Sequence, residues 1–128
     1  ELWRSDGTEP GTVMVKDIDP DFHAGCPQGL TAVFDLVFFT ADDEVHGDEL
    51  WVSDGTETGT VMVEDLWVGV PGSVPLYEPH RMTLVGSQLF VIADDGSTDL
   101  EPWVIELPHL FFDDFESGDT SEWSRSAR

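Results

Sequence analysis

The chain repeats one stretch of its own sequence: residues 49–66 read ELWVSDGTETGTVMVEDL, and residues 1–18 read ELWRSDGTEPGTVMVKDI. The two copies are identical at 14 of 18 positions, with an offset of 48 residues. Composition alone would give about one identity over this length, so the chain contains a duplication. A period of about 50 residues is typical of propeller blades and of helical solenoid units.

A weaker repeat extends the first one. Residues 82–103 align with residues 30–51 at an offset of 52, and 8 of the 22 pairs are identical. The third copy lacks the Ser-Asp-Gly-Thr hairpin, so we interpret it as a terminal repeat. The predicted organisation is an array over 1–107 (half a blade at 1–18, a full blade at about 30–66, half a blade at 82–107) and a C-terminal tail at 108–128.

The residue pattern of the repeat is that of β-strands. Residues 36–41 (LVFFTA) and 89–93 (LFVIA) are short runs rich in β-branched and aromatic residues, each followed by turn residues. We predict four strands in the full repeat, at 30–33, 36–41, 49–53 and 60–65. Strands apolar on both faces need copies of themselves on both sides. The predicted fold class is therefore all-β, with antiparallel four-stranded units of about 48–52 residues stacked as β-propeller-like blades.

The Ser-Asp-Gly-Thr stretch predicts a hairpin loop in each copy. We expect Asp54 to accept a hydrogen bond from a backbone N–H of its own loop, and Gly55 and Gly59 to supply positive φ angles. Asp6 and Gly7 take the same roles in the first copy.

Aromatic residues recur at two positions of the repeat. Trp3, Trp51 and Trp103 share one position, and Phe38 and Phe90 share another. A row of aromatic rings that stacks on sugars would have this pattern, but Trp beside Leu on a repeated strand is usually core. We therefore predict that these five residues form the repeat core.

Carboxylates gather in one loop of each repeat. The candidate metal ligands are Asp42, Asp43, Asp48, Asp94, Asp95 and Asp99. Two interpretations are open: the loops bind Ca²⁺, which takes oxygen ligands, or each Asp bonds its own turn backbone. The spacing does not match an EF-hand loop, and no other cofactor is expected.

Charge excludes several classes of protein. The chain has 27 Asp and Glu residues against 5 Lys and Arg residues, a formal net charge of −22. A nucleic-acid binder needs cations to displace phosphate counterions, so no nucleic-acid partner is expected. No apolar run approaches the roughly 18 residues of a membrane-spanning helix, and the single cysteine, Cys26, cannot form an internal disulfide.

The two hairpin segments resemble the ELWxxDGTxxGT repeats of large secreted or cell-surface bacterial proteins. The resemblance implies β-propeller-like repeats, a secreted or surface location, and no catalytic residue to carry over. The predicted function is a non-enzymatic structural or recognition module, with calcium stabilisation left open. Its expected partners are neighbouring repeats and an unknown protein or glycan ligand. The alternative is part of a propeller-type extracellular hydrolase.

The predicted array starts and stops within a repeat. We therefore expect two or three stacked antiparallel sheets that do not close into a ring. Such an array leaves apolar faces open at both ends, and repeat arrays without caps tend to associate.

Overall fold

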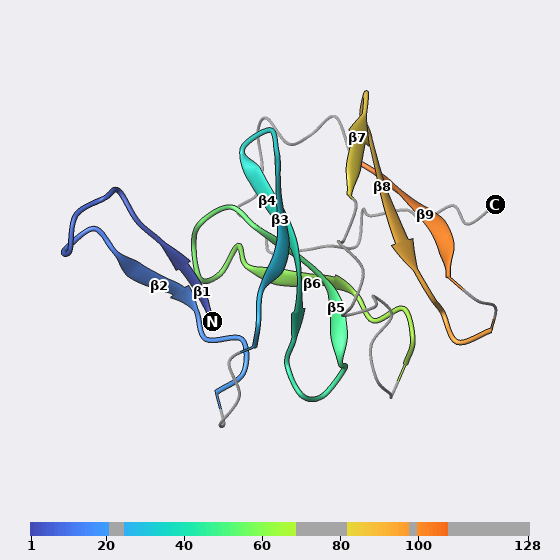
Figure 1. The fold of residues 1–128 in the computed structure, drawn as a ribbon, viewed down its shortest axis with the longest axis horizontal. Helices are drawn as coiled ribbons and strands as arrows, with labels where there is room; N and C mark the ends of the chain where they lie inside the picture. Colours follow the sequence, from blue (N-terminus) through green and yellow to red (C-terminus); the bar gives the residue numbers. More distant parts are fainter. Residues whose placement is uncertain (21–24, 69–81, 98–99, 108–128) are drawn as a thin grey trace.

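A computed structural model describes residues 1–20, 25–68, 82–97 and 100–107. The described residues form three separate antiparallel sheets and no helix (Figure 1). The all-β, antiparallel part of the predicted fold class is thereby confirmed. Among the described residues, nothing forms a helix long and apolar enough to cross a membrane. The predicted tail at 108–128 lies outside the described residues.

Each sheet is a simple meander, because every strand pairs with the next one along the chain. The N-terminal hairpin contains β1 (Leu2–Arg4) and β2 (Val13–Lys16). The middle sheet contains β3 (Gln28–Val33), β4 (Leu36–Asp42), β5 (Asp48–Ser53) and β6 (Val61–Glu64). The C-terminal sheet contains β7 (Thr83–Val85), β8 (Gln88–Ala93) and β9 (Glu101–Glu106). The four strands of the middle sheet match the four predicted strands to within two residues at each end.

The duplicated segments have the same strand register. Trp3 pairs with Met14 in the N-terminal hairpin, and Trp51 pairs with Met62 in the middle sheet. The register shifts just before the Trp in both pairs, as at a β-bulge. The sequence duplication is therefore a duplication of the β1–β2 hairpin in β5–β6.

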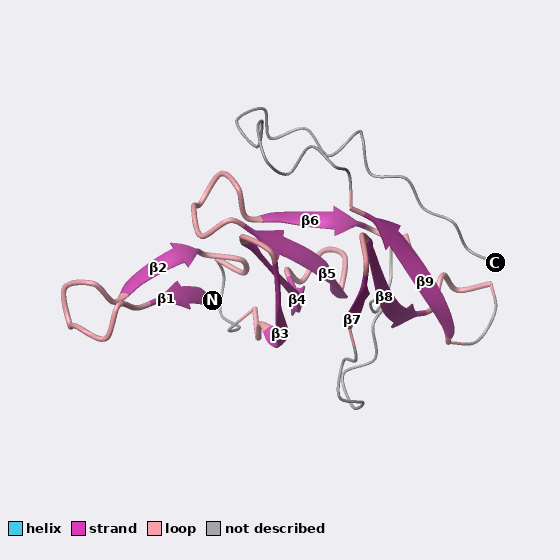
Figure 2. Ribbon diagram, turned by 90° about the horizontal axis from the view of Figure 1, so that it is seen from above, coloured by secondary structure: helices cyan, strands magenta, loops and turns pink. Residues whose placement is uncertain are grey.

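The middle sheet lies between the other two (Figures 1 and 2). Successive side chains of a strand point to opposite faces, and Phe38 and Phe39 of β4 are both fully buried. Phe38 belongs to an apolar cluster shared with the C-terminal sheet, whereas Phe39 belongs to a cluster shared with the N-terminal hairpin. Both faces of the middle sheet are therefore packed against a neighbouring sheet.

The three sheets stack in one direction. We call the face that carries the repeated Trp the Trp face, and the opposite side the reverse face. The reverse face of the N-terminal hairpin, with Leu2 and Val15, packs on the Trp face of the middle sheet, with Trp51. The reverse face of the middle sheet, with Phe38, packs on the Trp face of the C-terminal sheet, with Trp103. Both interfaces thus join a reverse face to a Trp face.

Two of the five predicted core aromatics are not fully buried. Trp51, Trp103 and Phe38 are buried, but Trp3 is 57% exposed and Phe90 is half-buried. Trp3 lies on the Trp face of the N-terminal hairpin, and no sheet among the described residues covers that face. Phe90 lies on the reverse face of the C-terminal sheet, which no other described sheet covers. Burial of a repeat position therefore depends on the neighbouring sheet as well as on the residue.

Candidate functional site

The hairpin loop between β5 and β6 is folded by its own side chains. Asp54 Oδ1 accepts hydrogen bonds from Thr56 N and Thr56 Oγ1, both at 2.7 Å. Thr56 Oγ1 in turn accepts a bond from Gly59 N at 2.9 Å. The hydroxyls of Ser53 and Thr60 are hydrogen-bonded at 2.7 Å, in a buried position at the base of the loop. Each Ser, Asp and Thr of the motif therefore has a partner inside the loop.

The first copy of the loop repeats this network. Asp6 Oδ1 accepts bonds from Thr8 N at 2.9 Å and Thr8 Oγ1 at 2.7 Å, and Thr8 Oγ1 accepts one from Gly11 N at 3.0 Å. The hydroxyls of Ser5 and Thr12 lie 2.6 Å apart. The Thr8 hydroxyl and then the Thr8 backbone N–H lower the pKa of Asp6. The loop backbone bond that the sequence predicts for each Asp is present in both copies.

The glycines of the motif serve two different physical needs. Gly7 and Gly55 have φ angles of 91° and 87°, which residues with a side chain rarely adopt. Gly59, also expected to supply a positive φ, does not have one. Instead, a Cβ on Gly59 would overlap the carboxylate of Asp54. Gly59 is needed because the Asp54 side chain fills the space beside its Cα.

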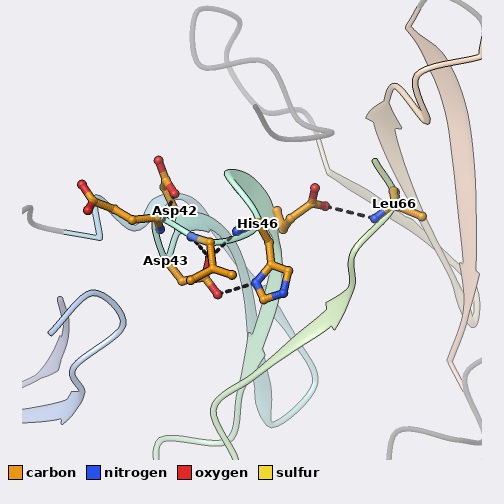
Figure 3. Close-up of polar contacts among 7 residues, drawn as sticks. Asp42, Asp43, His46 and Leu66 are labelled. Carbon is orange, nitrogen blue, oxygen red and sulfur yellow. Dashed lines mark hydrogen bonds and ion pairs between the residues drawn. The ribbon is translucent and has the colours of Figure 1, made fainter. Parts of the chain in front are cut away.

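The turn between β4 and β5 is also held by carboxylates (Figure 3). Asp43 Oδ1 accepts bonds from Val45 N at 3.0 Å and His46 N at 2.8 Å, and Asp43 Oδ2 lies 2.7 Å from His46 Nδ1. Asp42 Oδ1 accepts a bond from Glu44 N at 2.7 Å. These carboxylates bind the turn backbone, which is the second of the two interpretations left open by the sequence.

Hydrogen bonding and burial shift the pKa values of this turn in different directions. Burial acts to raise the pKa of Asp43, but the bonds from His46 and Val45 outweigh it and the pKa is lowered. The bond to Asp43 raises the pKa of His46. Both shifts favour the charged pair. The side chain of His46 is 34% exposed, so solvent weakens this pair.

Asp48 is a buried carboxyl group whose pKa is raised. It is 3% exposed, and it pairs across the strands with Asp42. Burial, and then the charge of Asp42, raises the pKa of Asp48 to about 6. Asp48 Oδ1 has no hydrogen-bond partner within the described part of the chain. The ionised form of Asp48 therefore costs stability at neutral pH.

The remaining metal candidates do not gather around a shared point. Asp94 Oδ1 accepts a bond from Gly96 N at 2.8 Å, and Asp95 Oδ1 accepts one from Ser97 N at 2.9 Å. Asp99 lies outside the described residues. Within the described ranges, no group of three or more His, Cys, Asp or Glu side chains could hold a metal ion. Of the five candidates that lie in the described part of the chain, only Asp42 and Asp48 pair directly across two strands.

The glutamate that precedes each Leu-Trp has a role that we did not predict from the sequence. Glu1 Oε2 accepts a bond from Ile18 N at 2.6 Å. Glu49 Oε2, in the fully buried side chain of Glu49, lies 3.5 Å from Leu66 N (Figure 3). Both contacts span 17 residues and join the start of a hairpin to the chain beyond it. The repetition of this Glu in ELW was the signal that could have revealed it.

Comparison of the chain with protein-family models, with curated proteins and with solved structures gives no match.

Proposed function

We propose that this chain is a non-enzymatic structural or recognition module made of β-propeller-like repeats, within a secreted or cell-surface bacterial protein. The observation that carries the proposal is the use of the motif side chains. In both copies of Ser-Asp-Gly-Thr, the Ser, Asp and Thr side chains bond within their own loop. Groups used in this way shape a scaffold and are not presented to a substrate.

The packing of the sheets supports the same proposal. Both interfaces join a reverse face to a Trp face, as successive blades would. The resemblance to ELWxxDGTxxGT repeats supports the location, and the net charge of −22 favours solubility and repels anionic surfaces. Calcium is not needed to explain the turn carboxylates, because turn backbone groups already bond to them.

The hydrolase alternative has weaker support. Asp42 and Asp48 are a pair of carboxyl groups, and one of them has a raised pKa, as in an acid–base pair. However, Asp48 is 3% exposed, so a substrate cannot reach it without opening the sheet. An apolar pocket between the middle and C-terminal sheets contains one acidic group, Glu64, among aliphatic and aromatic side chains. Convergent polar groups of the kind an active site needs are missing from that pocket.

An activity screen tests the proposal directly. The chain is incubated with chromogenic glycosides, esters and phosphate esters beside a heat-inactivated sample. We expect equal background rates in both samples. Saturable turnover that Asp48→Asn abolishes and Asp43→Asn retains would contradict the proposal and favour the hydrolase.

A further inference from the structure

The two outer faces of the stack are repeat copies of faces that are buried inside it. At one end, Trp3 is 57% exposed and Met14 is 45% exposed. Their counterparts 48 residues later are Trp51, which is buried, and Met62, which packs against the same cluster. The outer face of the N-terminal hairpin therefore has the chemistry of an interior Trp face.

The other end presents the complementary face. On the reverse face of the C-terminal sheet, Val85 is 57% exposed and Ile92 is 42% exposed, beside the half-buried Phe90 and Val104. Successive side chains of a strand point to opposite faces of the sheet. The strand pairing therefore places these four side chains on the face that points away from the stack. Their counterparts 52 residues earlier are Val33, Thr40, Phe38 and Val52, which are all at most 1% exposed.

A single chain cannot bring these two faces together in the arrangement observed. The N-terminal hairpin and the C-terminal sheet lie at opposite ends of the stack, with the middle sheet between them (Figures 1 and 2). A second copy of the chain offers the missing partner at either end. Its reverse face would meet the Trp face of the first copy, which is the pairing seen at both internal interfaces.

We propose that the chain associates head to tail, with the reverse face of β7–β9 in one copy packed on the Trp face of β1–β2 in the next. This inference deepens the proposed function, since it rests on the same stacked repeats. The contact is heterologous, so each copy uses two different surfaces, and copies add to one another until the assembly closes. Two copies of a chain with a net charge of −22 repel each other at low ionic strength. Salt screens this repulsion and therefore strengthens the association.

Sedimentation velocity over a range of chain concentrations tests the proposal. The wild-type chain is expected to show a sedimentation coefficient that rises with concentration. Trp3→Asp removes the Trp face and Ile92→Asp removes the reverse face, and each is expected to weaken association about thirtyfold or more. Val45→Asp adds the same charge at a side chain 71% exposed in the β4–β5 turn, and is expected to associate like the wild type.

A mixing experiment identifies the mode of contact. Trp3→Asp keeps an intact reverse face and Ile92→Asp keeps an intact Trp face, so an equimolar mixture should form a dimer while each variant alone stays monomeric. If Ile92→Asp alone still dimerises and the mixture adds nothing, the contact joins two Trp faces and the proposal is wrong. Met14→Asp and Val85→Asp replace the first pair if either variant lacks the wild-type circular dichroism spectrum.

A wild-type chain that stays monomeric at every concentration would also overturn the proposal. That result would leave the proposed module function intact, since the activity screen measures it separately.

Discussion

Trp67, which follows β6, lies against Gly96 in the turn after β8, and a Cβ on Gly96 would lie 2.6 Å from Trp67 Nε1. The contact joins the chain beyond the middle sheet to the C-terminal sheet. Gly96 also has a φ angle of 77°. The absence of a side chain at residue 96 therefore serves both the turn and the contact between two repeats.

Gly96→Ala should lower the free energy of unfolding more than Gly86→Ala does. Both glycines have positive φ angles, so each alanine costs about 1–2 kcal/mol in backbone strain. A Cβ on Gly86 meets nothing within 4 Å, whereas one on Gly96 displaces the Trp67 ring, at a further cost of about 1–3 kcal/mol. Urea unfolding measures the difference, and equal losses for the two variants would argue against the Trp67 contact.

Asp54 and Gly59 should be energetically coupled. Asp54→Ala removes a side-chain cap of the loop and should cost about 0.5–2 kcal/mol, while Glu57→Ala in the same loop is an exposed control. Gly59→Ala forces the Asp54 carboxylate out of its place. In the Asp54→Ala background that space is free, so the second substitution should cost much less. A double-mutant cycle in urea measures the coupling, and strictly additive costs would show that Asp54 does not fill the space.

Asp48→Asn should stabilise the chain at neutral pH. The pKa of Asp48 is raised to about 6 in the folded chain, whereas an ordinary Asp has a pKa of about 3.9. Between these two pH values the folded chain keeps a proton on Asp48 that the unfolded chain has lost. Wild-type stability therefore falls as the pH rises through this window. The variant should gain about 1–3 kcal/mol near pH 7.5 and little below pH 4, as measured by urea unfolding at each pH.

Asp43→Asn is the control, because its effect on stability at neutral pH should be opposite to that of Asp48→Asn. The pKa of Asp43 is lowered in the folded chain. The ionised Asp43 therefore contributes to the free energy of unfolding at pH values above the ordinary Asp pKa, and this contribution is lost as the pH falls through the pKa of the folded chain. This variant should be less stable than the wild type at pH 7.5, and the deficit should vanish in acid. A loss of stability in Asp48→Asn at pH 7.5 would contradict the assignment of Asp48 as a buried, unfavourable charge.

Ca²⁺ and Mg²⁺ should raise the melting temperature equally at matched ionic strength. The described turn carboxylates of Asp42, Asp43, Asp94 and Asp95 bind their own backbones, which leaves screening of the negative charge as the common effect. Differential scanning calorimetry with both ions and with NaCl measures the shifts. A larger shift with Ca²⁺ would show a true site, because Ca²⁺ accepts irregular oxygen ligands more readily than Mg²⁺.

The sequence predicts local features of this fold better than it predicts burial. The Ser-Asp-Gly-Thr loops follow from short-range hydrogen bonding, and the strands of the middle sheet follow from apolar runs. The exposure of Trp3 could not be predicted from its identity with Trp51, because it depends on which sheet lies alongside. The role of Gly59 depends on the packing of a side chain, and the contact from Glu49 to Leu66 spans a whole hairpin.

Substitution of Trp51 and of its repeat counterpart Trp3 tests the central claim most directly, namely that each interior Trp face is covered by the neighbouring repeat. Trp51 is 6% exposed and stacks with Phe39 at a centroid distance of 6.5 Å, whereas Trp3 is 57% exposed. At dilute, monomeric concentration, Trp51→Ala should lower the free energy of unfolding by about 3–5 kcal/mol, and Trp3→Ala by less than about 1 kcal/mol. Equal losses for the two variants, measured by urea unfolding, would contradict the stacked arrangement.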